Sequence, residues 1–303
     1  MVEIINTEKI AELIKDGSMV AISGFVGSGC AEELVCAIEN SYLENGRPRD
    51  LSVVYGAGQG DGKNKGINHL AYEGLVKRVI GGHWGLAPKM AKLAVDNKIE
   101  AYNFPQGVIM NIYRDIAAKK PGTISQVGLH TFVDPRLSGA KVNEKTKQDL
   151  VEVISIGGKE CLFFKTFAID VALIRGTSAD TSGNISMERE ANLIDVLAIA
   201  QAAHNCGGTV IVQVERIVEK KTLNPWMVKI PGILVDYIVV SNPENHWQTF
   251  SQKYDPALSG ETRMPLGMIA PMPLDERKVI SRRAFKEIND GDVVNLGIGC
   301  QKE

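Results

Sequence analysis

Short runs of β-branched residues alternate with helical stretches along most of this chain, and glycine or aspartate marks many of the junctions. This alternation restricts the fold more than any other feature, because strands that alternate with helices pair in parallel and are covered by those helices. We expect an α/β fold with an open, mostly parallel sheet flanked by helices. The expected strands cover residues 19–23, 51–55, 78–81, 151–156, 170–174, 209–214 and 234–240. The expected helices cover residues 7–15, 31–44, 86–96, 107–118, 190–204 and 281–289.

A proline-rich stretch interrupts this pattern near the end of the chain. Pro265, Pro271 and Pro273 fall in a segment with neither a helical nor a strand period, which is typical of an extended linker. We therefore predict three parts. They are an N-terminal domain over residues 1–262, a linker over 263–279 and the start of a second domain over 280–303.

The segment after the linker repeats the pattern of the N-terminus. Residues 282–297 read as a helix, an Asp-Gly turn, an apolar strand and a glycine loop, as residues 7–23 do. Such a pattern can arise by chance, but its place directly after a linker favours a duplicated, two-half architecture. One strand and a loop cannot cover their own apolar faces, so we interpret the second half as truncated.

Charge and hydrophobicity exclude two classes of partner. The chain has 34 basic and 36 acidic residues and no dense basic stripe, so we expect no nucleic-acid partner. No stretch approaches the ~18 apolar residues that cross a bilayer, and the N-terminus lacks the basic and apolar segments of an export signal. These features predict a cytoplasmic protein without a membrane partner.

The cysteines give no sign of a disulfide framework or a metal centre. None forms a CxxC pair or has zinc-finger spacing from a histidine, so we expect reduced thiols and no metal site. The five cysteines are Cys30, Cys36, Cys161, Cys206 and Cys300.

Two glycine-rich loops follow expected strands. The first matches neither GxGxxG nor a phosphate-binding P-loop, so neither a dinucleotide nor an ATP site is indicated. Ligands of open α/β sheets bind at the carboxyl ends of the strands, where both loops are expected. A tight strand-to-helix turn and a flexible surface loop are the structural alternatives. The candidate binding residues are Gly24, Phe25, Gly27 and Gly29 in the first loop and Gly56, Gly58 and Gly60 in the second.

Two further side chains are candidates for chemistry. His83 stands beside Trp84 where an expected strand leads into a helix, and it is either a site residue or a packed structural histidine. Gln106 directly precedes an expected helix, where its amide is able to donate a hydrogen bond to a developing oxyanion. A helix-capping or solvent-exposed role is the alternative for Gln106. Residues 170–184 read as a strand and a polar turn without an assignable chemical role.

Taken together, five ordered segments resemble the family I CoA-transferases, most closely the single-chain acetate or propionate CoA-transferase branch. The resemblance covers nearly the whole chain. The segments are residues 16–29, 81–85, 103–107, 170–184 and 282–284.

This resemblance implies two homologous α/β halves with the active site between them and a glutamate of the second half that attacks the acyl-CoA thioester. The position matching Gln106 supplies an amide that steadies the thioester oxyanion. The nucleophile of the family follows the second half's glycine loop by a few dozen residues, so we expect it beyond residue 303. Four glutamates lie outside that motif and are expected at a surface or a helix start, namely Glu32, Glu33, Glu188 and Glu190.

The function implied by the resemblance is transfer of coenzyme A between a short-chain acyl-CoA, such as acetyl- or propionyl-CoA, and a carboxylate. It implies no cofactor beyond the thioester substrate, a second-half or beta-type domain as partner, and a homo-oligomer when complete. Alone, the chain is expected to be inactive. The alternatives are a non-catalytic alpha-type subunit or pseudoenzyme fragment that needs a partner chain, and a sugar-phosphate isomerase or sensor, whose signature is missing.

Overall fold

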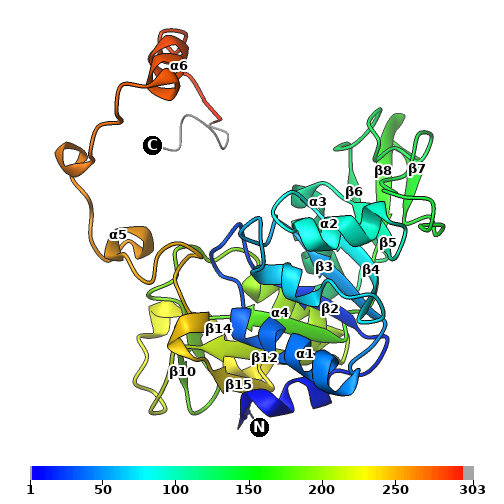
Figure 1. Cartoon of the computed structure of the whole chain (residues 1–303). Helices are drawn as coiled ribbons and strands as arrows, with labels where there is room; N and C mark the ends of the chain where they lie inside the picture. Colours follow the sequence, from blue (N-terminus) through cyan, green and yellow to red (C-terminus); the bar gives the residue numbers. More distant parts are fainter. Residues whose placement is uncertain (1, 296–303) are drawn as a thin grey trace. The chain divides into compact units, whose positions relative to one another are not determined.

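The structure is a computed structural model that describes residues 2–295, and the chain divides into the units Met1–Glu261 and Thr262–Glu303. The first unit contains every strand of the described residues (Figure 1). In the second unit, helix α6 spans Glu276–Phe285, so the helix expected over 281–289 begins earlier, where Asp275 accepts a hydrogen bond from the Lys278 amide. Of the strand expected near the C-terminus, the residues from 296 onward lie outside the described part, as does Cys300.

A parallel eight-stranded sheet forms the centre of the first unit, in the order β1-β15-β12-β9-β2-β3-β4-β5. Every neighbouring pair in it is parallel, which confirms the predicted α/β architecture. The strands are β1 (Glu3–Ile4), β2 (Met19–Ile22), β3 (Leu51–Tyr55), β4 (Val76–Gly81), β5 (Glu100–Asn103), β9 (Val171–Arg175), β12 (Thr209–Val214) and β15 (Tyr237–Val240).

Two smaller sheets lie outside this central sheet. One pairs β6 (Gly122–Ser125), β8 (Lys159–Lys165) and β7 (Val151–Ile156) in antiparallel fashion. The strand expected over 151–156 therefore exists but belongs to a hairpin, because Gly157 and Gly158 both adopt positive φ and reverse the chain. The other sheet contains β13 (Arg216–Val218), β10 (Ser178–Asp180), β11 (Ile185–Ser186) and β14 (Val228–Ile230).

Three of the expected helices of the first unit are confirmed within about two residues. They are α1 (Glu32–Asn45), α2 (Pro88–Val95) and α3 (Gln106–Ala117). The expected helix over 190–204 is shorter, as α4 (Val196–Asn205), because Ile194 adopts a positive φ that a helix does not accommodate.

The helix expected over 7–15 was wrong in type. Its hydrogen bonds run from Ile10 to Thr7 and from Ile14 to Ala11, so it consists of two turns of 3₁₀ helix. The short helices of the chain are η1 (Thr7–Lys9), η2 (Ala11–Leu13), η3 (Gly66–Leu70), η4 (Pro225–Met227), η5 (Gly232–Leu234), η6 (Pro243–Asn245), η7 (Leu266–Met268) and α5 (Pro256–Ser259).

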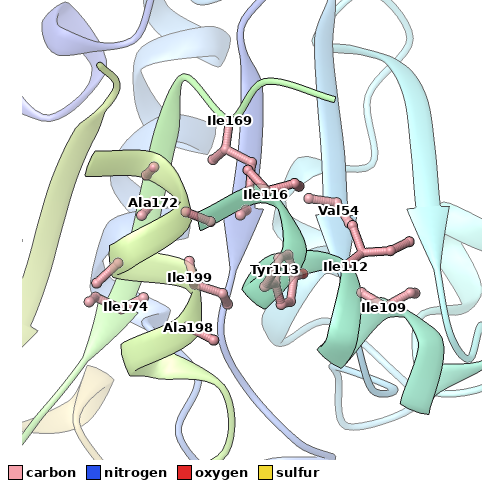
Figure 2. Packing of buried hydrophobic residues seen from close by; sticks show 14 of the residues in the cluster. Val54, Ile109, Ile112, Tyr113, Ile116, Ile169, Ala172, Ile174, Ala198 and Ile199 are labelled. Carbon is pink, nitrogen blue, oxygen red and sulfur yellow. The ribbon is translucent and has the colours of Figure 1, made fainter. Parts of the chain in front are cut away.

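Helices cover both faces of the central sheet, because alternate strand residues point to opposite sides. Val54 belongs to the apolar cluster under α3 and α4, whereas its neighbours Val53 and Tyr55 belong to the cluster under α1 and α2. Figure 2 shows the first cluster, with Ile112 of α3 and Ile199 of α4 in front of the strands. This layered core leaves the carboxyl ends of the strands for loops.

No helix among residues 2–295 combines the length and the apolar composition that crossing a membrane requires.

Candidate active site

The two glycine loops meet at the carboxyl edge of the sheet, where β2 and β3 end. The Val26 amide donates to the Gly58 carbonyl at 2.6 Å, and the Gly60 amide donates to the Val26 carbonyl at 3.0 Å. The side chain of Gln59 is buried between the loops and donates from Nε2 to the Ile22 carbonyl at 2.9 Å. The structure thus brings the predicted loops together, and it adds Gln59, which sequence reasoning missed.

Most of the predicted binding glycines are required by close packing of the loops. A Cβ on Gly58 would stand 2.5 Å from Nδ1 of His83, and one on Gly24 would stand 2.6 Å from Sγ of Cys30. At Gly24, the buried Cys30 thiol and a φ of +142° favour glycine, whereas a Cβ on Gly58 would require the exposed His83 side chain to move. Built Cβ atoms would also crowd neighbouring atoms at Gly27, Gly29, Gly56 and Gly60.

Phe25 and His83 are the exposed side chains of this edge. Phe25 is 42% exposed in a tight turn in which its amide and that of Ser28 bond each other's carbonyl. His83 is exposed beside Gly58, and its carbonyl accepts a hydrogen bond from the Tyr55 hydroxyl at 3.0 Å. The backbone of His83 is held by this hydrogen bond, while its imidazole lies beside Gly58 and Gly85.

Gln106 is the first residue of α3 and is exposed. It follows β5 and Pro105, and its Cα would lie 3.3 Å from a Cβ placed on Gly82. The same Cβ would overlap the carbonyl oxygen of Gly56, so Gly82 lies between the second glycine loop and Gln106. Gln106, the second loop and the loop after β4 therefore form one continuous surface.

A buried carboxyl group lies under this surface. Asp195, the residue before α4, is only 4% exposed, and its Oδ2 would be 3.4 Å from a Cβ on Gly56. Within the described residues, neither oxygen of Asp195 has a hydrogen-bond partner. Burial raises the pKa of Asp195 to about 7, against the opposing field of Arg114. The sequence signal that we missed is a single acid directly before an apolar helical run.

A second buried polar group joins the first glycine loop to the turn after β15. Arg175, at the end of β9, is 3% exposed and pairs through Nε with Glu190 at 3.0 Å. Its Nη1 donates to the Trp247 carbonyl at 2.7 Å and to the Cys30 carbonyl at 3.4 Å. Arg175, Glu190 and His246 are among the residues lining a pocket of about 220 Å³.

Glu190 was wrongly expected at a surface or a helix start. Burial acts to raise the pKa of its carboxyl group, but Arg175 and then His246 hold that pKa below its usual value. Burial lowers the pKa of His246, so the group consists of an ionised Arg–Glu pair with a neutral imidazole.

The other three glutamates are compared with the same expectation of a surface or helix-start position. Glu32 and Glu33 lie in the first turn of α1, as expected. Glu188 is half-buried outside any helix and accepts hydrogen bonds from Ser178 at 2.5 Å and from Ser186 at 2.6 Å. Its side chain remains partly exposed and pairs with Arg216 at 2.8 Å, so it lies at the surface but not at a helix start.

Comparison with known proteins identifies relatives across this fold. A model of the coenzyme A transferase family matches residues 4–241. A caffeate CoA-transferase of Acetobacterium woodii is 48% identical over 304 residues, which cover 100% of this chain and 58% of that protein. Acetate CoA-transferase YdiF of Escherichia coli K12 is 41% identical over 300 residues, covering 98% of this chain and 56% of that protein.

Solved structures give the same relationship. The acyl-CoA transferase YdiF apoenzyme of Escherichia coli O157:H7 matches with a TM-score of 0.92 at 40% identity, over 99% of this chain and 57% of that one. The chain thus spans somewhat more than half the length of these relatives. The alpha subunit of an Escherichia coli K12 acetate CoA-transferase is 30% identical over 75% of this chain and 91% of that subunit.

Proposed function

This chain belongs to the coenzyme A transferase family, and on that premise we propose that it supplies one half of the site that transfers coenzyme A between an acyl-CoA and a carboxylate. The observation that carries this proposal is the hydrogen-bonded pair of glycine loops beside Gln106 at the carboxyl edge of the sheet. Such an edge is where open α/β sheets bind their ligands.

The proposed reaction is a ping-pong exchange through a glutamate of the second half. Its carboxylate attacks the thioester carbonyl, the C–S bond breaks, and coenzyme A leaves as a thiolate while an acyl-glutamyl anhydride forms. The thiolate then attacks the glutamyl carbonyl, which releases the first carboxylate and leaves a glutamyl-CoA thioester. The acceptor carboxylate reverses both steps, so the chemistry needs neither ATP nor a further cofactor.

Within this scheme, Gln106 of this chain stabilises the oxyanion. Its side chain is exposed on the surface formed with the loop after β4, so the amide is free to turn toward a thioester carbonyl. Once the bound substrate and the second half fix this amide against the oxyanion, such a donor is worth about 3 kcal/mol of transition-state stabilisation.

The proposal also has to specify which acyl groups the enzyme transfers. We propose acetyl and propionyl groups as short-chain substrates, and the relatives named for acetate support the first of these. The relative named for caffeate extends the acceptors to be tested to an aromatic acid. Competition between acetate, propionate and caffeate for one acyl-CoA donor ranks them directly.

The test is turnover of acetyl-CoA with propionate by residues 1–303, alone and together with the second half of a full-length relative. We expect propionyl-CoA only in the mixture. Turnover by the chain alone would contradict a nucleophile in the second half. In that case Asp195→Asn would show whether the buried carboxyl under Gly56 takes its place.

A separate polypeptide is the alternative source of the second half. The 30% identity to an alpha subunit, which the match covers almost in full, supports this arrangement, although the longer relatives match this chain at 48% and 41% identity. Co-purification of a beta-type chain would support it, whereas a complete single-chain gene product would exclude it. In either form of the proposal, the complete enzyme is a homo-oligomer in the cytoplasm. The four cysteines among the described residues are free thiols, which is compatible with that reducing compartment.

A further inference from the structure

A polar cluster next to the second glycine loop, outside the residues assigned to the candidate active site, joins α1 to η3. Glu32, Cys36 and Glu39 lie on α1, and His69 lies on η3. Nε2 of His69 is 3.0 Å from Oε1 of Glu32 and 3.5 Å from Sγ of Cys36. The donor atoms of Glu32, Cys36 and His69 all lie within 4.8 Å of one another.

We propose that Glu32, Cys36 and His69 bind a divalent transition-metal ion, with zinc the best match. Zinc prefers thiolate, imidazole and carboxylate ligands in tetrahedral geometry. Zinc–ligand bonds of 2.0–2.3 Å in that geometry separate sulfur from nitrogen by ~3.6 Å and nitrogen from oxygen by ~3.3 Å. The Sγ–Nε2 and Nε2–Oε1 distances of 3.5 and 3.0 Å are close to these values.

The surroundings hold the ligand atoms in the required orientation. Nδ1 of His69 contacts Glu39, whose other oxygen accepts a hydrogen bond from Tyr72 at 2.7 Å. A carboxylate on the far ring nitrogen is the usual support of a metal-binding histidine. Oε2 of Glu32 accepts from the Gly66 amide at 2.9 Å, which leaves Oε1 directed to His69.

The site is reachable yet sheltered. The side chain of His69 is 17% exposed and that of Glu32 is 7% exposed, so an ion is able to enter while bulk water is largely excluded. Glu32 follows the first glycine loop, and Gly66 begins the short helix after the second loop. A bound ion therefore crosslinks the segments that follow both loops. Sequence spacing predicted no metal site because Cys36 and His69 are 33 positions apart.

A proton competes with the metal for the same histidine. Burial opposes protonation of His69, but its contacts with Cys36, Glu32 and Glu39 raise the pKa to about 11. Zinc binding to Nε2 of His69 therefore has to displace a proton. The rival interpretation is that His69 stays protonated and that the cluster never binds a metal ion.

The test is metal binding to the metal-stripped, reduced chain, measured with Zn²⁺ by calorimetry and with Co²⁺ by absorption. We expect one ion per chain, a thiolate-to-cobalt charge-transfer band, and a rise of the melting temperature with Zn²⁺ but not with Mg²⁺. Cys36→Ser and His69→Gln should each weaken Zn²⁺ binding at least 100-fold, and Glu39→Gln should weaken it 10–100-fold.

Cys206→Ser is the matched control, because Cys206 is an exposed free thiol elsewhere on the chain. It should leave the affinity for Zn²⁺ and the cobalt band unchanged. The proposal is overturned if the unmodified chain binds no Zn²⁺, if the cobalt band follows Cys206, or if His69→Gln binds as tightly as the control. Far-UV circular dichroism checks that each variant is folded, and Cys36→Ala replaces Cys36→Ser if that variant is not.

Discussion

At the scale of single residues, the structure separates side chains that are exposed at the candidate site from side chains that hold its loops. Gln106 is exposed at the start of a helix, whereas Gln59 is buried and bonded to the backbone of the first loop. The two glutamines are alike in chemistry and differ in placement, and only Gln106 is available to a substrate.

In the complete enzyme, Gln106→Ala should lower kcat by roughly 10²–10³, because one oxyanion donor is lost. Asn111→Ala is the control, since Asn111 is exposed on the same helix and bonds only the Gly107 carbonyl. Steady-state kinetics of both variants decide the matter. A Gln106→Ala rate within about twofold of the control's would remove this amide from the mechanism.

Asp195 gives stability a pH dependence of known sign. Its pKa rises from 3.8 to about 7 on folding, so the native state keeps a proton that the unfolded chain has lost. Its contribution therefore falls as pH rises from about 4 to 7. Asp195→Asn should gain about 2–3 kcal/mol over the parent between pH 5 and pH 8 in urea unfolding.

Asp96→Asn is the control for this series, because Asp96 is exposed and pairs only with Lys92 at the surface. Its difference from the parent should not change between the two pH values beyond the small effect of a surface pair. An Asp195→Asn difference that is equally independent of pH would show that this carboxyl ionises freely in the native state.

At the scale of elements, close packing against neighbouring backbone, rather than a need for flexibility, explains why some loop positions are glycine. Gly82→Ala would drive a methyl group into the Gly56 carbonyl, and we expect a loss of about 1–3 kcal/mol of unfolding free energy. Gly107→Ala should instead stabilise the chain by up to about 1 kcal/mol, since it lies in α3 with open space around its Cβ. Denaturant unfolding of the pair measures both signs, and equal effects would refute the packing argument.

The elements also show what the sequence could and could not predict. Strongly apolar strands such as β9 and β12 were predicted, because a strand buried on both faces reads as one apolar run. Strand β5 was missed, since its residues Glu100 and Asn103 are polar and it lies at the edge of the sheet. Helix α4 was predicted too long, because Glu190 resembles a helix start until Arg175 is seen beside it.

For the candidate site, the sequence predicted the loops but not their supports. Gly58 and Gln106 stand out as local signals at strand and helix ends. Asp195 and Arg175 contact those loops from distant parts of the chain. A local signal, the acid before an apolar helical run, marks Asp195, but no local pattern shows which loop either residue supports. The sequence also failed to predict the cluster of Cys36 and His69, because these residues lie far apart in the chain.

At the scale of the whole molecule, the central sheet and its helices belong to the unit Met1–Glu261, and α6 of the other unit buries none of its residues. A chain that ends at Glu261 should therefore keep the melting temperature of residues 1–303 within about 2 °C. Calorimetry of both chains, prepared under the same conditions, tests this. A drop of 10 °C or more would show that Thr262 onward stabilises the first unit.

The hydrogen bonds between Val26, Gly58 and Gly60 have one more consequence. They join the two glycine loops into one rigid unit, which the hydrogen bond from the buried Gln59 side chain to the Ile22 carbonyl also stabilises. A ligand that pushes on either loop displaces both, and a substitution confined to one is felt at the other. Kinetic defects from the two loops should therefore fail to add when the changes are combined.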